Sequence, residues 1–258
     1  PLGVGSKGEI QDLENLASGC VRKYWETLMR PGNLVLAVSG DYQREPLIES
    51  LQEIAEQLQG NPFQEVDAPF PGPAESGRIN ETMDREQAVL FQAYPDIGVT
   101  DPARPAMLVL HELLNGMSSN LFNEVREKRS MAYFVGAGRV SGIESGMFYL
   151  YAGTAPDSVE EVYHQFDLEM RRLASGQVKD RELDRAKARL KVSKRMQYQT
   201  AGNRTLEAAL NKLYGLPVNE FLQFDKQVDA VVAGDIQSVL QERIVAAEPL
   251  QLTVRAEE

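Results

Sequence analysis

Two side chains near the middle of the chain have the chemistry to bind a peptide carbonyl. Arg126 is expected in the last turn of a helix over residues 119–129, and Tyr133 early in a strand over 132–140. A guanidinium and a phenol both donate hydrogen bonds, and such donors stabilise charge that develops on a carbonyl oxygen. Each also has an ordinary structural explanation, because cations favour helix C-termini and tyrosine is common in sheets. The residue types alone favour the structural interpretation.

The two histidines, His111 and His164, do not have the spacing of a zinc site. A catalytic zinc ion takes three protein ligands, and peptidase motifs place two histidines close together on one helix. His111 begins a His-Glu-Leu-Leu-Asn run in which Asn115 stands where the second histidine would be, and His164 falls in a different expected helix. We therefore expect no metal site and no cofactor in this chain. Neither histidine belongs to a recognisable Ser-His-acid triad.

The elements after residue 81 must position these side chains. Alternating or short apolar runs indicate strands, and apolar residues spaced by three and four indicate amphipathic helices. The expected strands cover residues 88–94, 132–140, 146–153 and 250–254. The expected helices cover residues 104–115, 119–129, 156–174, 180–199, 204–213 and 235–244. This mixture predicts an α+β domain over 81–258, with an antiparallel-rich sheet and helices packed on one face.

A smaller helix–strand–helix unit is expected over residues 1–60. Amphipathic helices over 9–29 and 45–59 flank a short apolar run, Leu34–Val38, which we interpret as a buried strand. The only cysteine, Cys20, falls at a core spacing of the first helix. It is expected to be a small buried apolar residue and not a nucleophile.

A connector is expected over residues 61–80, where prolines and glycines interrupt every periodic pattern. The order helix, proline, alternating strand occurs twice, at Pro31 and at Pro249. This echo suggests two related units, with the end of the first joined to nearly all of the second. Because Pro1 cannot initiate translation, we expect a processed or excised piece of a longer protein.

The composition narrows the class of partner. The net charge is −11 and the pI is near 4.9, so the chain is repelled by nucleic acid and by anionic membrane surfaces. No apolar run approaches the roughly 18 residues of a membrane-spanning helix, and the start does not read as a signal peptide. We expect a soluble protein with neither partner. Bacterial cytoplasm, periplasm and mitochondrial matrix all remain open as its location.

Residues 118–133, which read SSNLFNEVREKRSMAY, carry a resemblance to a known family. They are similar to the arginine–tyrosine element in the second half of pitrilysin-family zinc peptidases, which include insulin-degrading enzyme and mitochondrial processing peptidase. The family pattern, small-Ser-x-Leu-Phe-x-x-x-Arg-x-Lys-x-x-x-Ala/Gly-Tyr, is met at every position. Residues 24–41 resemble the end of the first half, and residues 86–95 resemble the opening strand of the second.

The resemblance implies two homologous halves that close like a clam-shell, with this chain forming the C-terminal, non-catalytic half. The first half carries a His-x-x-Glu-His zinc motif that is absent here, where Met107 and Leu110 stand in place of a ligand and the catalytic base. Arg126 would hold a substrate carbonyl and Tyr133 would stabilise the tetrahedral intermediate. The implied parent is a zinc metalloendopeptidase, with this chain inactive alone. Its implied partners are a peptide substrate and the catalytic half of the same polypeptide.

Two alternatives stay open at this point. Some relatives in the family have lost catalysis and serve as scaffold subunits of larger complexes. Others are paired systems in which a partner subunit brings the zinc ion while a second chain brings the arginine and tyrosine. A general acidic binding module is a weaker explanation, because it leaves the pattern at Arg126 and Tyr133 unexplained.

Overall fold

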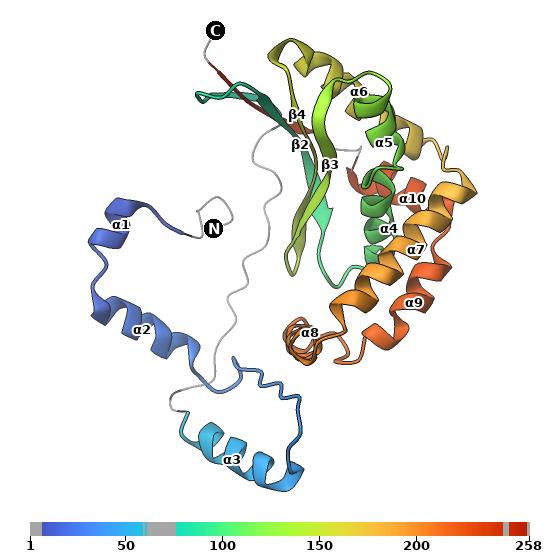
Figure 1. Cartoon of the computed structure of the whole chain (residues 1–258). Coiled ribbons are helices and arrows are strands. Elements are labelled where there is room, and N and C mark those ends of the chain that lie inside the picture. Colours follow the sequence, from blue (N-terminus) through green and yellow to red (C-terminus); the bar gives the residue numbers. More distant parts are fainter. Residues whose placement is uncertain (1–6, 59, 61–75, 245–247, 257–258) are drawn as a thin grey trace. The chain divides into compact units, whose positions relative to one another are not determined.

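The computed structural model describes residues 7–58, 60, 76–244 and 248–256. The chain divides into two compact units, residues 1–68 and 69–258, and each is described by itself (Figure 1). The expected connector over 61–80 falls largely on residues 61–75, which lie outside the described part. Residues 77–80 within it form part of a strand, Gly77–Thr82.

The second unit is built on a five-stranded sheet in the order β1-β5-β2-β4-β3. The strands are β1 (Gly77–Thr82), β2 (Ala88–Ile97), β3 (Ala132–Ser141), β4 (Ser145–Thr154) and β5 (Leu250–Arg255). The pair β1–β5 is parallel, and the pairs β2–β5, β2–β4 and β3–β4 are antiparallel. The prediction of an antiparallel-rich sheet is confirmed. Strand β1 was not expected, because its polar residues gain a partner only from the far end of the chain.

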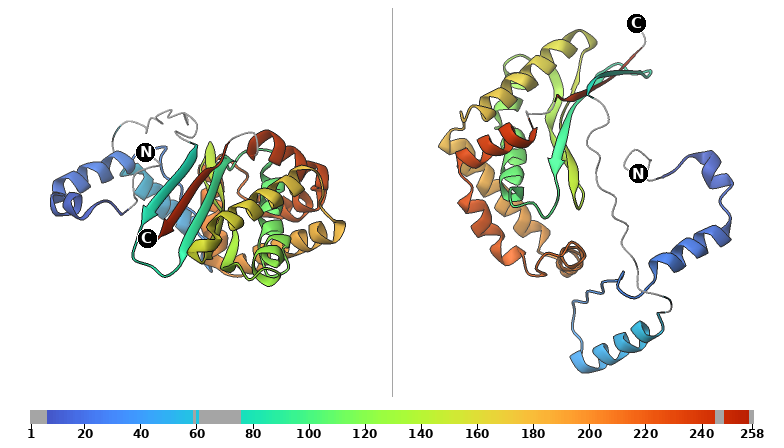
Figure 2. Two further views of the ribbon diagram at one scale, coloured as in Figure 1. Left: turned by 90° about the horizontal axis from the view of Figure 1, so that it is seen from above. Right: turned by 180° about the vertical axis from the view of Figure 1, so that it is seen from behind.

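The helices of this unit all lie on one face of the sheet, as Figures 1 and 2 show. The α-helices are α4 (Arg104–Leu114), α5 (Asn120–Phe122), α6 (Val159–Ala174), α7 (Asp180–Gln197), α8 (Ala201–Leu213), α9 (Phe221–Ala230) and α10 (Ala233–Val239). A 3-10 turn, η2 (Pro156–Ser158), precedes α6, and two π-helical turns, η1 (Asn123–Glu127) and η3 (Leu240–Ile244), follow α5 and α10. The α+β architecture is as predicted, with α9 as an additional helix.

The two faces of the sheet differ in how they are covered. On the helix face Leu90 and Phe148 are fully buried, and Phe166 of α6 is fully buried with them. On the other face the side chains of β2 are only half-buried, and two glycines of β3 leave room for tyrosine rings of β4. A Cβ atom at Gly138 would come within 2.3 Å of the Tyr149 ring, so glycine is required there for the ring to lie against the strand.

The first unit contains three helices, α1 (Ile10–Glu14), α2 (Ser18–Leu28) and α3 (Arg44–Glu56), and none of their residues is buried. The single helix expected over 9–29 is interrupted at residues 15–17, between α1 and α2. The expected strand over residues 34–38 is wrong for this structure, since no described strand pairs with it and a strand needs a partner backbone.

The expectation that Cys20 is buried is also wrong, because its side chain is exposed on α2. Trp25, the only tryptophan of the chain, lies on the same helix with 59% of its surface exposed. The reason is shared: within residues 7–58 the amphipathic helices have no second layer to pack against. An apolar stripe marks a face that is stabilised by burial, but the stripe does not supply the covering surface.

Candidate functional site

The segment that carries Arg126 and Tyr133 begins at the end of α4. Gly116 follows that helix with φ +84°, a left-handed conformation that glycine adopts without strain. Ser119 then caps α5, because its Oγ accepts a hydrogen bond from the Phe122 backbone N–H at 3.1 Å.

The helix expected over 119–129 covers residues 120–127, and its second part is a π-helical turn. Three α-helical residues lead into the five-residue π turn η1, whose C-cap Lys128 donates its backbone N–H to the Asn123 carbonyl at 2.9 Å. Leu121 and Val125 are buried and anchor one face of this segment in the core. π turns are uncommon and often mark functional positions.

Arg126 lies in the last turn of η1, as predicted, and its side chain is exposed. Its guanidinium carbon is 5.2 Å from the ring centroid of Phe122, one turn earlier, which is a cation–π contact. The neighbouring cations are held differently: Lys128 pairs with Glu124 at 2.6 Å and Arg129 pairs with Glu161 of α6 at 3.0 Å. The Arg126 guanidinium thus lies over an aromatic ring, and the residue is exposed to solvent.

Tyr133 lies at a β-bulge in β3. Ala132 pairs with Thr154 of β4 while Phe134 pairs with the next residue, Gly153, so Tyr133 is the extra residue on its strand. It is 59% exposed. A bulge redirects a side chain relative to the regular pleat, and bulges are frequent beside functional sites.

A tight turn joins the two elements and orders the backbone between Arg126 and Tyr133. Ser130 takes a left-handed conformation (φ +51°), and Met131 donates its backbone N–H to the Val125 carbonyl at 3.0 Å. Thr154 of β4 donates its hydroxyl to the Met131 carbonyl. No hydrogen bond or ion pair joins Arg126 to Tyr133 within the described ranges. Their convergence on one peptide carbonyl stays a prediction.

The histidines are placed as the sequence indicated, on separate helices. His111 of α4 is half-buried with its Nδ1 3.7 Å from Glu112 Oε1, and His164 of α6 is exposed. Met107 and Leu110 of α4 are fully buried in the core. Across residues 7–58, 60, 76–244 and 248–256, no group of three or more His, Cys, Asp or Glu side chains is arranged to hold a metal ion.

Glu112 of α4 makes a contact with Arg189 of α7. Burial alone would raise the pKa of Glu112, but the nearby His111 side chain and the charge of Arg189 lower that pKa below its usual value. Arg189 of α7 donates one hydrogen bond to Glu112 Oε2 at 2.5 Å and another to the Asn115 carbonyl at 2.7 Å. The end of α4 is thereby tied to α7.

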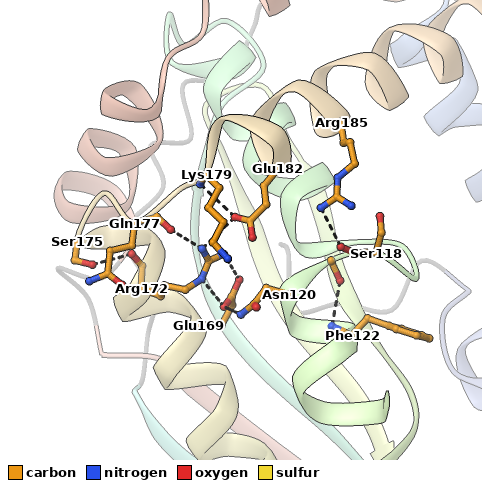
Figure 3. A network of polar contacts seen from close by, with 11 residues as sticks. Ser118, Asn120, Phe122, Glu169, Arg172, Ser175, Gln177, Lys179, Glu182 and Arg185 are labelled. Carbon is orange, nitrogen blue, oxygen red and sulfur yellow. Dashed lines mark hydrogen bonds and ion pairs between the residues drawn. The ribbon is translucent and has the colours of Figure 1, made fainter. Parts of the chain in front are cut away.

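A polar network at the start of α5 was missed by the sequence reasoning (Figure 3). Asn120 donates to Glu169 of α6, which is also held by Arg172. The signal that could have revealed half of it is the spacing of Glu169 and Arg172, three residues apart in a helix whose buried face is otherwise apolar except for Gln165.

A cavity of about 390 Å³ lies elsewhere, between the loop before α4 and the helix α9. Its lining includes Arg104 and Glu220, whose side chains form an ion pair at 3.0 Å, but neither Arg126 nor Tyr133. The cavity is therefore separate from the candidate site.

Among the helices in the described part of the chain, none is both long and apolar enough to span a bilayer.

Comparison with known families gives a match to the peptidase M16 inactive domain over residues 19–190. An uncharacterized zinc protease of Streptomyces coelicolor is 31% identical over 200 residues, which is 74% of this chain and 43% of that protein. A second such protein, from Rickettsia felis, is 27% identical over 213 residues, which is 82% of this chain and 51% of the relative. The chain thus spans about half the length of these relatives.

Solved structures of low identity share the fold. The crystal structure of a peptidase M16 inactive domain from Pseudomonas fluorescens has a TM-score of 0.83 at 19% identity, covering 98% of this chain and 61% of that one. A chain of complex III2 from Candida albicans has a TM-score of 0.80 at 18% identity, covering 98% of this chain and 62% of that one.

Proposed function

Because the chain belongs to the peptidase M16 inactive-domain family, we propose that it supplies substrate contacts to peptide hydrolysis at a zinc ion held outside it. The predicted resemblance to the non-catalytic half of pitrilysin-type peptidases is confirmed by that family match. The relatives named zinc proteases are about twice as long as this chain, which leaves room in them for a zinc-binding half.

The observation that carries the proposal is the placement of Arg126 and Tyr133 on either side of one ordered turn, both exposed. Arg126 would donate hydrogen bonds to a carbonyl of the bound peptide. Tyr133 would donate its phenolic hydrogen to the oxyanion of the tetrahedral intermediate, where a fixed donor lowers the barrier. Bound in the other half, zinc would polarise the scissile carbonyl and lower the pKa of a water molecule.

The organisation of the chain follows from this proposal. Residues 1–60 would be the end of the catalytic half, residues 61–80 the connector, and residues 81–258 the inactive domain. The partner would be the catalytic half of the same polypeptide or a zinc-bearing partner subunit, with a peptide as substrate and no role for nucleic acid or a membrane. In the described residues the two histidines lie on separate helices, and Met107 and Leu110 of α4 are buried, so we place the zinc ion of the proposal outside this chain.

A scaffold role is the alternative, and specific similarities favour keeping it. A chain of complex III2 from Candida albicans shares the fold, and a probable inactive metalloprotease of Bacillus subtilis is 22% identical over 98% of this chain. In a scaffold, Arg126 and Tyr133 would have no substrate to contact. The two functions therefore differ in what substitution of these residues does to turnover.

The test uses the complete zinc-bearing protein, with peptide hydrolysis as the readout. Tyr133→Phe keeps the ring and removes the donor, so kcat should fall roughly 100-fold, the scale seen when one oxyanion donor is lost. Arg126→Lys should weaken turnover as well, because a single ammonium cannot reproduce the planar fork of the guanidinium. Matched controls are Tyr214→Phe at the end of α8 and Arg195→Lys on the exposed face of α7, which should leave turnover unchanged.

A second arm assays this chain alone for zinc content and hydrolysis. We expect neither stoichiometric zinc nor cleavage, with activity only when the zinc-bearing half is present. Zinc binding and cleavage by this chain alone would overturn the proposal. Unchanged turnover in both Tyr133→Phe and Arg126→Lys would overturn the substrate-contact role and support the scaffold alternative.

A further inference from the structure

The helical segment that carries Arg126 cannot hold its own position. Three residues of α5 and five of η1 make it up, fewer than the roughly 12 that an isolated helix needs for stability in water. Leu121 and Val125 fix which face turns to the core. Apolar contact is not directional, so it does not by itself fix where the segment lies along its axis. Directional polar contacts must do so.

The first such contact is made by Asn120, the opening residue of α5. Its Nδ2 donates to Glu169 Oε2 at 2.6 Å, and Glu169 is only 4% exposed although it is an acid (Figure 3). Arg172 holds both oxygens of that carboxylate, with Nε at 2.9 Å and Nη2 at 2.8 Å. A two-point contact of this kind fixes direction as well as distance.

The acceptor for Asn120 is itself fixed from a second helix. Arg172 also donates to Glu182 Oε2 of α7 at 3.1 Å, and to the Gln177 carbonyl in the loop between α6 and α7. Burial alone would lower the pKa of Arg172, but its bonds to Glu169 and Glu182 raise that pKa, so the cation stays charged. The buried carboxylate is therefore paired whether or not Asn120 is present.

The far end of the segment is tied to the same helix. Arg129, just beyond η1, pairs with Glu161 of α6 at 3.0 Å, and Gln165 donates to the same Glu161 oxygen at 2.9 Å. Both ends of the segment thus take their position from α6, and the Asn120–Glu169 contact is the more buried of the two.

From this geometry we infer that Asn120 is a positioning residue, which acts with Glu169 and Arg172 to set the place of Arg126 beside the substrate. The inference rests on the proposed function, since it concerns the same site. Asn120 contacts no reacting atom in this role. It fixes the start of α5 so that the guanidinium, at the other end of the segment, lies where a peptide carbonyl will be bound.

The decisive variant reverses the hydrogen bond. Asn120→Asp places a carboxylate against Glu169, and the repulsion should shift α5 and lower kcat/KM of the complete zinc-bearing protein roughly 10- to 100-fold. Adding Glu169→Gln removes that repulsion at unchanged net charge, because the new amide can donate to the new carboxylate. Arg172 then keeps only one of its two contacts with residue 169, so part of the activity should return. Asn203→Asp is the matched control. Asn203 of α8 also donates through Nδ2, to the Gln197 carbonyl at the end of α7 at 2.8 Å, but it belongs to neither α5 nor η1.

A double-substitution cycle separates positioning from a general loss of stability. In the Arg126→Lys background, Asn120→Asp should cost little further activity, because the group being positioned is already altered. The same fold-loss in both backgrounds, or no recovery with Glu169→Gln, would overturn the inference while the proposed function stands. Unchanged activity in Arg126→Lys alone would overturn the proposed function and this inference with it.

Hydrogen exchange on this chain gives a readout that needs no activity. Asn120→Asp should speed exchange of the backbone amides over residues 122–128, and addition of Glu169→Gln should slow it again. Exchange that is unchanged over this range in Asn120→Asp would show that the contact does not hold the segment, and would overturn the inference directly.

Discussion

The two units of the chain contain helices with similar patterning and opposite burial. α6 of the second unit buries Val162, Phe166 and Leu173, whereas α2 and α3 of the first bury no residue. Each of these helices has an apolar face at three-and-four spacing. The difference lies in what is opposite: α6 has a sheet beneath it. Periodicity therefore shows which face gains from burial, and the covering layer has to come from elsewhere in sequence.

The same contrast is seen between two similar strand sequences. Residues 34–38 and residues 250–254 both follow a helix and a proline, and both alternate. The second pairs with β1 on one side and β2 on the other, while the first has no paired strand in the described part of the chain. An alternating sequence becomes a strand only when neighbouring backbones supply its hydrogen bonds.

The largest expected effect on stability is the removal of a core aromatic side chain from the second unit, compared with removal of an exposed one from the first. Phe166→Ala should lower the free energy of unfolding by about 3–5 kcal/mol, because it leaves a cavity in the core. Trp25→Ala should change that free energy by less than about 0.5 kcal/mol, because the ring is mostly exposed. Urea unfolding of both variants, followed by circular dichroism, measures the contrast. Similar losses would show that the first unit has a core of its own.

A buried ion pair should give the next effect. Asp96 accepts from Arg139 Nε at 2.6 Å and Nη2 at 3.1 Å, with both side chains almost wholly buried. Arg139→Met leaves an unpaired buried carboxylate and should cost about 3 kcal/mol. Its control is Arg195→Met, whose exposed pair with Asp225 should contribute less than about 1 kcal/mol. Equal costs in urea unfolding would contradict the dependence on burial.

The smallest effect is a dependence on alkaline pH. Burial raises the pKa of Tyr94 to about 12, although the hydrogen bond from Gln92 opposes the shift. Because the folded-state pKa is raised from about 10, the stabilisation is complete below pH 10 and is lost as pH rises toward 12. The loss should reach about 1 kcal/mol at pH 11 relative to pH 9.

Tyr94→Phe should remove that part of the pH dependence, as urea midpoints at pH 9 and pH 11 would show. The control is Tyr42→Phe, because Tyr42 lies in the first unit and is 47% exposed; this variant should keep the pH dependence of the parent chain. An unchanged pH dependence in Tyr94→Phe would mean that another group is responsible.

What could be predicted from sequence follows from how local each interaction is. The strands β3 and β4 were expected within a residue or two of their ends, because each strand's pattern is contiguous and the two are neighbours in the chain. Strand β1 was not expected, because its residues from Gly77 to Thr82 gain a partner only from β5. Cys20 was expected to be buried because it lies on the apolar face of its helix. It is exposed because the pattern does not show whether another layer covers that face.

The candidate site divides in the same way. The positions of Arg126 at a helix end and Tyr133 at a strand start could be predicted from the adjacent residues. The π turn and the bulge could not, since both arise from how the segment fits against β4 and the core. The Glu169–Arg172 pair has a local spacing that could be recognised, but the contact of Asn120 with Glu169 joins residues far apart in the chain and could not be.

The lone tryptophan has a practical consequence for spectroscopy. Trp25 belongs to the first unit, and the tyrosines other than Tyr24 and Tyr42 belong to the second. Fluorescence excited selectively at tryptophan therefore reports on α2 alone, whereas near-ultraviolet dichroism is dominated for the second unit by its tyrosines. One unlabelled sample thus carries two optical signals, and unfolding of either unit can be assigned by which signal changes.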